Sequence, residues 1–246
     1  MIGAVTGAVV GLLASPVLRA VAARHSVPYG EPLRVCCPRG RYWLLPNGSC
    51  SGCEERGGPT PGLVELAAAG VGAAIGSVAQ SPGMQSPVMH SQVTYWPMVL
   101  VLAWVGLFGV VLGFVDAAVF RLPDALTLPL ALGTAALLVL AELLTEHQGG
   151  ALLCCLYAGL AFGACYGALA LVAPIGFGDA KLAPSLGAVL GWYGWNTALA
   201  GFFYGFLLAS LWGAALLLTG RSKRGDSLAF GPAMLLGALL AVLAAS

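Results

Sequence analysis

Charged residues are scarce in this sequence. Only 9% of its 246 residues are Asp, Glu, Lys or Arg, and 59% are hydrophobic. Soluble domains carry charge at about a quarter of their positions, so a domain that mostly faces water is excluded. The net charge of +1 also excludes a strongly basic surface, and we expect no nucleic-acid partner. The composition therefore predicts a protein that lies in the lipid bilayer.

Glycine, in contrast, is abundant. Many of the 35 glycines lie inside apolar runs such as GAVTGAVVGLL and LAGFFYGFLLASLWGAALLL. Small residues allow membrane helices to approach one another closely, where lipid removes the hydrophobic driving force for association. This pattern predicts a packed bundle rather than a single membrane anchor.

About eight apolar runs are candidate membrane spans. They cover approximately residues 2–22, 62–80, 97–115, 125–142, 150–173, 182–193, 196–219 and 229–245, and the run at 182–193 is the shortest. We interpret the first run as a retained span, because it lacks the charged start and cleavage site of a signal peptide. The predicted fold is therefore all-α, a polytopic helical membrane bundle. It divides into a first span (1–22), a small irregular cytoplasmic loop lobe (23–61) and the rest of the bundle (62–246).

The basic residues predict how this bundle is oriented. With alternating loops, all of them fall on one side: Arg19, Arg24, Arg34, Arg39, Arg41, Arg56, Arg121, Lys181, Arg221, Lys223 and Arg224. The opposite loops hold only Glu142, Glu146, His90 and His147 besides polar and aromatic residues. The positive-inside rule makes the first side cytoplasmic and places both termini outside. We expect a multi-pass protein of the inner (cytoplasmic) membrane.

Two aspartates are predicted to lie at similar depth on the cytoplasmic face. Asp116 ends the third span and Asp179 lies between the fifth and sixth. An acid near membrane depth costs about 2.5–3.5 kcal/mol on insertion scales, so each requires a reason. Simpler explanations exist: Asp116 could merely end a span, and Asp179 could be a loop acid paired with Lys181.

Two further acids have structural interpretations. Asp124 follows Pro123 and is a candidate helix N-cap or first-turn acid. Glu65 begins the second span and could simply face the cytoplasmic interface.

The segment GFGDAKL favours a catalytic interpretation of Asp179. Gly176 and Gly178 allow a sharp turn, which is tolerated at membrane depth only where protein or water satisfies the backbone. Such a turn could present Asp179 to Asp116. Two neighbouring carboxylates share a proton, so that one can activate water while the other hydrogen-bonds the scissile carbonyl. The pair therefore predicts peptide hydrolysis.

Several segments together resemble the type IV prepilin leader peptidases, which are polytopic GxGD-type aspartic proteases. The resemblance rests on a D-x6-P-D-x-L-T-L-P run from Asp116 to Pro129, followed by GFGDAKL. The AFGPAMLLGALLA segment is similar to that family's FGP segment in the last span. GPTPGLVELAAA, which contains Glu65, is similar to its PLVEL run.

The resemblance implies an activity and a site. The catalytic pair falls on Asp116 and Asp179, and proteolysis requires no cofactor. Asp124, Gly176, Gly178 and Lys181 match supporting positions. The implied substrates are prepilins or pseudopilins of type IV pili and protein secretion, whose basic leader lies in the cytoplasm and whose apolar helix lies in the membrane. Cleavage follows a glycine at the cytoplasmic interface.

The first cytoplasmic segment departs from the family pattern. Many members have two CxxC pairs there, whereas this sequence has adjacent Cys36 and Cys37 and a single pair, Cys50 and Cys53. Four thiolates would bind zinc, but neighbouring cysteines make a poor half-site, so free or redox-paired thiols are the alternative.

The same departure bears on a second activity. Many members also methylate the new amino terminus with S-adenosylmethionine, an activity linked to this segment, and the departure puts methylation in doubt. Three further cysteines, Cys154, Cys155 and Cys165, are predicted to be small apolar packing residues.

Two other classes of function compete with a protease. A transporter would use embedded carboxylates to carry protons or cations, and predicts acids staggered across the bilayer and interrupted helices in corresponding halves. A structural component, or a protease homologue without activity, would leave the paired motifs unexplained. The sequence does not indicate an oligomeric state.

Overall fold

The structure, a computed structural model, describes residues 1–27, 59, 62–81, 96–145, 150–172, 176–220 and 229–246. In these ranges all regular structure is helical. The helices are α1 (Ile2–His25), α2 (Leu63–Val78), α3 (Trp96–Val119), α4 (Asp124–Thr145), α5 (Gly150–Val172), α6 (Phe177–Trp192), α7 (Trp195–Leu218) and α8 (Gly231–Ala245). Each predicted span corresponds to one of them, so the prediction of an all-α bundle is confirmed.

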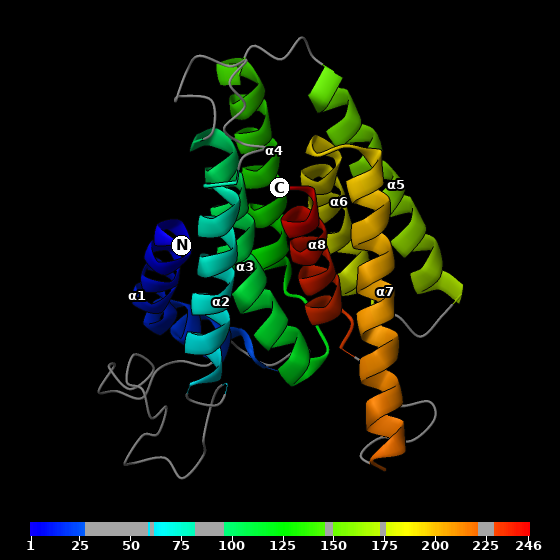
Figure 1. Cartoon of the computed structure of the whole chain (residues 1–246). Coiled ribbons are helices and arrows are strands. Elements are labelled where there is room, and N and C mark those ends of the chain that lie inside the picture. Colours follow the sequence, from blue (N-terminus) through cyan, green and yellow to red (C-terminus); the bar gives the residue numbers. More distant parts are fainter. Residues whose placement is uncertain (28–58, 60–61, 82–95, 146–149, 173–175, 221–228) are drawn as a thin grey trace.

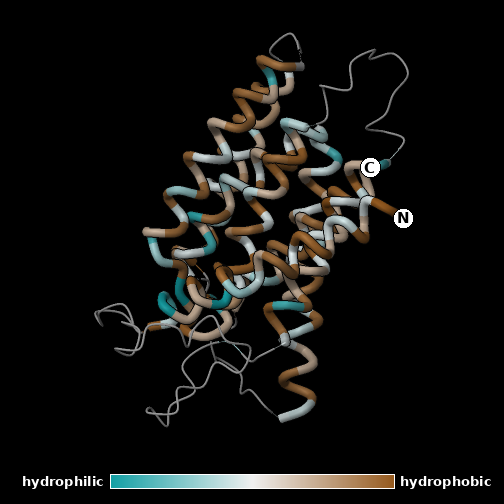
Figure 2. The backbone as a smooth tube through the Cα atoms, turned by 90° about the vertical axis from the view of Figure 1, so that its left-hand side faces the viewer, coloured by the Kyte–Doolittle hydropathy of each residue, from teal (hydrophilic) through white to brown (hydrophobic). Residues whose placement is uncertain are grey.

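Five helices are long and apolar enough to cross a membrane, namely α1, α3, α4, α5 and α7. Helices α2 and α8 are apolar but shorter. Apolar colours cover most of the helical backbone in Figure 2, with only a few hydrophilic segments. The chain is a multi-pass membrane protein.

The helices alternate in direction. The ends of α1, α3, α5 and α7 lie toward the lower part of Figure 1, where α4, α6 and α8 begin. This arrangement brings together segments that are far apart in the sequence: the last turns of α3 and the first turns of α6 and α8. We call this end of the bundle the acidic end, because it holds both Asp116 and Asp179.

Glycines allow α1 and α2 to pack with their backbones in contact. A Cβ added at Gly7 would overlap the carbonyl oxygen of Gly72, and one added at Gly72 would overlap that of Gly7. The same holds between Gly3 and Gly76. From one contact to the next, the residue number rises along α1 and falls along α2, so the two helices are antiparallel. Packing through small residues is the expected mode of association in lipid.

Similar contacts join the other antiparallel pairs. A Cβ at Gly187 in α6 would lie 2.7 Å from the carbonyl oxygen of Ala158 in α5. On the other side of the bundle, a Cβ at Gly237 in α8 would meet the backbone of Gly205 in α7. The prediction that glycine serves helix packing is therefore confirmed at these contacts.

Helix boundaries differ from those predicted by a few residues, and three of the differences change the place of an acid. Helix α3 continues to Val119, and α4 continues to Thr145, so Glu142 is helical and only 6% exposed rather than part of a loop. Helix α6 begins at Phe177, which puts Asp179 in its first turn rather than in a turn between spans. The length of an apolar run underestimates the length of such a helix. The helix continues through polar residues, because its backbone groups bond one another, and it ends only where a breaker or a cap occurs.

The breakers are visible in the backbone. Phe120, directly after α3, adopts the left-handed conformation with φ of 51°, and Pro123 precedes α4. Gly176 is extended, with φ of −66° and ψ of 136°, and forms the N-cap of α6.

Candidate active site

Asp116 and Asp179 are both buried at the acidic end. Asp116 lies in the last turn of α3 and is 4% exposed, and Asp179 lies in the first turn of α6 and is 3% exposed. Their carboxylates are close enough to interact electrostatically. The structure therefore brings together the two acids that the sequence predicted to converge.

The start of α8 contacts Asp116 directly. The backbone N–H of Gly231 donates a hydrogen bond to Asp116 Oδ2 over 3.0 Å, in a buried position. A Cβ at Gly231 would lie 2.8 Å from the same oxygen. A third helix thus reaches the acid pair, and it does so through its backbone.

The environment of Asp179 is different. Within the described part of the chain, its Oδ1 is buried without a hydrogen-bond partner. Its Oδ2 lies beside Gly176, where an added Cβ would be 3.6 Å away. A buried polar oxygen without a partner is uncommon and marks a position where a substrate or a water molecule can bind.

An aromatic cluster flanks the acid pair. Tyr166 of α5, which lies near Asp179, is 1% exposed. Its ring lies 5.7 Å from that of Phe206 in α7 and 5.8 Å from that of Phe230. The sequence did not indicate Tyr166 or Phe206 as site residues, because the sequence pattern does not distinguish a lipid-facing aromatic residue in an apolar run from one that faces a site. Only the FGP segment pointed to Phe230.

The segment between α3 and α4 packs against the first turn of α6. A Cβ at Gly178 would lie 2.7 Å from the side chain of Leu122 and 3.1 Å from its backbone nitrogen. Nearby, the ammonium group of Lys181 pairs with the carboxylate of Asp124. The suggestion that Asp179 is a loop acid paired with Lys181 is therefore wrong, whereas Asp124 is a first-turn acid, as predicted.

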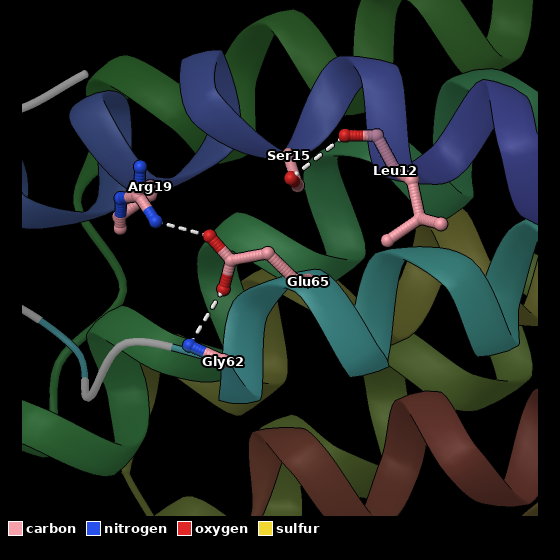
Figure 3. Close-up of polar contacts among 5 residues, drawn as sticks. All are labelled: Leu12, Ser15, Arg19, Gly62 and Glu65. Atoms are coloured by element: carbon pink, nitrogen blue, oxygen red, sulfur yellow. Dashed lines mark hydrogen bonds and ion pairs between the residues drawn. The ribbon is translucent and has the colours of Figure 1, made fainter. Parts of the chain in front are cut away.

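Glu65 belongs to a separate polar cluster, shown in Figure 3. The guanidinium of Arg19 in α1 pairs with Glu65 Oε1. The Glu65 Oε2 accepts the backbone N–H of Gly62 over 2.9 Å and so caps the start of α2. The Glu65 carboxylate therefore links α1 to α2 and also caps the start of α2. The sequence had predicted only that Glu65 could face the cytoplasmic interface.

Another buried acid lies at the opposite end of α4. Glu142 lies near Cys155 of α5, which is 3% exposed. Sequence reasoning placed Glu142 in an outer loop and missed its burial. The three cysteines of α5 have free thiols, and the burial of Cys155 confirms its predicted role in packing.

The predicted zinc ligands Cys36, Cys37, Cys50 and Cys53 lie outside the described residues. Among the residues that the structure does describe, no group of three or more His, Cys, Asp or Glu side chains could hold a metal ion.

An apolar cavity of about 290 Å³ lies between α2, α3, α6 and α8. Ala117 and Pro232 form part of its wall, and they directly follow Asp116 and Gly231 in the sequence. The two carboxylates, of Asp116 and Asp179, are not part of this lining. Such a pair can share one proton and hydrolyse an amide by acid–base catalysis.

Comparison with known proteins agrees with this chemistry. Residues 100–218 match the type IV leader peptidase family. Over 227 residues the chain is 28% identical to "Prepilin leader peptidase/N-methyltransferase" of Aeromonas salmonicida (strain A449), covering 85% of this chain and 71% of that protein. The protein of the same name from Aeromonas hydrophila is 28% identical over 225 residues, with the same shares.

A third relative gives a shorter match with higher identity. "Prepilin leader peptidase/N-methyltransferase" of Bacillus subtilis (strain 168) is 43% identical over 94 residues, covering 35% of this chain and 36% of that protein. No solved structure gives a significant match. The family resemblance drawn from the sequence is confirmed, and the transporter alternative gains no support.

Proposed function

We propose, on the premise that residues 100–218 match the type IV leader peptidase family, that the protein is a membrane aspartic endopeptidase that removes the basic leader from prepilin-like or pseudopilin substrates. The catalytic residues of the proposal are Asp116 and Asp179. One observation carries it: within the matched region, two buried acids from α3 and α6, separated by 63 positions, interact at one end of the bundle.

The proposed reaction needs only these two carboxyl groups and water. One carboxylate takes a proton from water as the water oxygen bonds to the scissile carbonyl carbon, and the other carboxyl gives its proton to the carbonyl oxygen. The resulting diol then collapses. The first carboxyl passes its proton to the leaving nitrogen, the C–N bond breaks, and a diol hydroxyl returns a proton to the second carboxylate.

The proposal places cleavage on the cytoplasmic face of the inner membrane. The acidic end is the end where α1 and α3 finish, and the basic residues Arg24, Arg121 and Lys181 lie there. The positive-inside rule favours a cytoplasmic location for that end. A basic leader in the cytoplasm would then meet the acid pair where its apolar helix enters the bilayer.

The proposal does not extend to methylation. The relatives named above are peptidases and N-methyltransferases, but the cysteine segment of this chain departs from the pattern linked to methyl transfer. The mass of the new amino terminus after cleavage decides the point, because a methyl group adds to it.

Co-expression with a prepilin tests the proposal. The wild-type enzyme should shorten the prepilin to a new amino terminus after the glycine, whereas Asp116→Asn and Asp179→Asn should each abolish cleavage and still insert in the membrane. The matched control is Glu142→Gln, which also replaces a buried acid by an amide but lies at the other end of α4, and it should retain cleavage. Full cleavage by either aspartate variant would contradict the assignment of the pair.

A further inference from the structure

The acid pair is asymmetric, and the asymmetry comes from the start of α8. The N–H of Gly231 is directed at Asp116 Oδ2. The Asp179 carboxylate has the backbone of Gly176, in its own helix start, beside Oδ2, but its buried Oδ1 has no partner among the described residues. In a pair that shares one proton, the carboxylate that accepts a buried hydrogen bond is favoured as the charged one over the carboxylate that keeps a buried oxygen unpaired.

We propose that Gly231 is a positioning residue that holds Asp116 as the charged carboxylate, so that Asp116 activates the water and Asp179 holds the proton given to the carbonyl oxygen. This inference rests on the proposed function and assigns the two roles within it.

The sequence at the start of α8 suits this task. The first N–H groups of a helix have no partner within the helix and lie at the positive end of its dipole. Here Pro232, the second residue of α8, has no N–H, so the free donors of this turn are those of Gly231 and Ala233. The N–H of Met234 already bonds the carbonyl of Phe230. The helix start thus presents Gly231 to Asp116.

Space, rather than backbone conformation, requires glycine at this position. Gly231 is not among the glycines with positive φ. A Cβ there would lie 2.8 Å from Asp116 Oδ2 and 3.3 Å from its Cγ. At these distances the atoms overlap, so a side chain at position 231 must shift either the Asp116 carboxylate or the start of α8.

The aromatic cluster fixes the helix start in place. Phe230, the N-cap residue, is 7% exposed, and its ring lies 5.0 Å from Phe206 and 5.8 Å from Tyr166. These contacts come from α7 and α5. The position of the Gly231 N–H is therefore set by helices other than the two that carry the acids.

The decisive variant is Gly231→Ala, assayed for cleavage of a prepilin in the full-length protein. Displacement of Asp116 should reduce kcat by about a hundredfold. The substrate contacts remain, so KM should stay within about twofold of the wild type. The matched control is Gly201→Ala in α7, whose Cβ would lie 2.5 Å from the flexible end of Leu190, near the end of α6 that lies away from Asp179. It should leave kcat nearly unchanged.

A folded Gly231→Ala enzyme with wild-type kcat would overturn the inference, and so would an equal loss in Gly201→Ala. If Gly231→Ala does not fold, Phe230→Ala tests the same point, because it removes the ring contacts of the helix start without touching either acid. A kcat reduced by about tenfold or more at constant KM is expected there, and an unchanged kcat contradicts the inference. In either case the proposed function stands if wild-type cleavage still requires both aspartates.

Discussion

The guanidinium of Arg19 in α1 pairs with the carboxylate of Glu65 in α2, and the same carboxylate caps the start of α2 at Gly62 (Figure 3). The Arg19 side chain is 4% exposed and that of Glu65 is 25% exposed. Removing one partner of a buried pair leaves the other charge without compensation, which is strongly destabilising.

We therefore expect Arg19→Gln to destabilise the protein by about 2 kcal/mol, somewhat less than for a fully buried pair because Glu65 is partly exposed. Thermal unfolding in detergent measures the loss. The control is Arg24→Gln, which removes an exposed charge one turn further along α1 and should leave the midpoint nearly unchanged. Equal midpoints for the two variants would show that the pair does not hold α1 to α2.

The pair between Lys181 and Asp124 should matter much less. Its side chains are 50% and 72% exposed, and exposed pairs contribute only about 0–1 kcal/mol. We expect Lys181→Met to lower the stability by less than about 1 kcal/mol and the rate of leader cleavage by no more than about fivefold. Abolished cleavage in a folded Lys181→Met protein would instead indicate a direct role in the reaction. The reversed pair, Lys181→Asp with Asp124→Lys, should then separate charge pairing from that role.

Glycine substitutions in α2 should have opposite effects on its two faces. Gly72→Ala places a Cβ against the backbone of Gly7, and overpacking of this kind costs about 1–3 kcal/mol. Gly70→Ala meets nothing within 4 Å and should be neutral or stabilising by up to about 1 kcal/mol, because alanine restricts the unfolded chain. Unfolding midpoints in detergent compare the two. Similar midpoints for both variants would refute the close contact between α1 and α2.

The cysteine segment should serve folding rather than catalysis. We expect Cys50→Ser to reduce the yield of folded protein more than it changes kcat, whether the thiols bind zinc or pair by oxidation. Size-exclusion chromatography gives the yield, and metal analysis of the purified protein distinguishes zinc from free thiols. The control is Cys165→Ser, which alters a free thiol of α5. Normal yield with complete loss of cleavage would contradict this view of the segment.

The sequence by itself determined the number of helices and the identity of the acid pair. Each apolar run became one helix, because a segment in lipid must satisfy its backbone internally and a helix does so locally. Asp116 and Asp179 were found because acids in apolar surroundings are few, and because their motifs are local strings of residues.

The tertiary structure alone decided which residues meet across the bundle. In a membrane protein, hydrophobicity does not separate lipid-facing from buried positions, so the sequence could not show that Glu142 is buried or that Tyr166 lies near Asp179. The hydrogen bond from the Gly231 N–H to the Asp116 carboxylate joins residues 115 positions apart. It depends on the glycine contacts that set how α8 packs against α7, and no local pattern encodes such a contact.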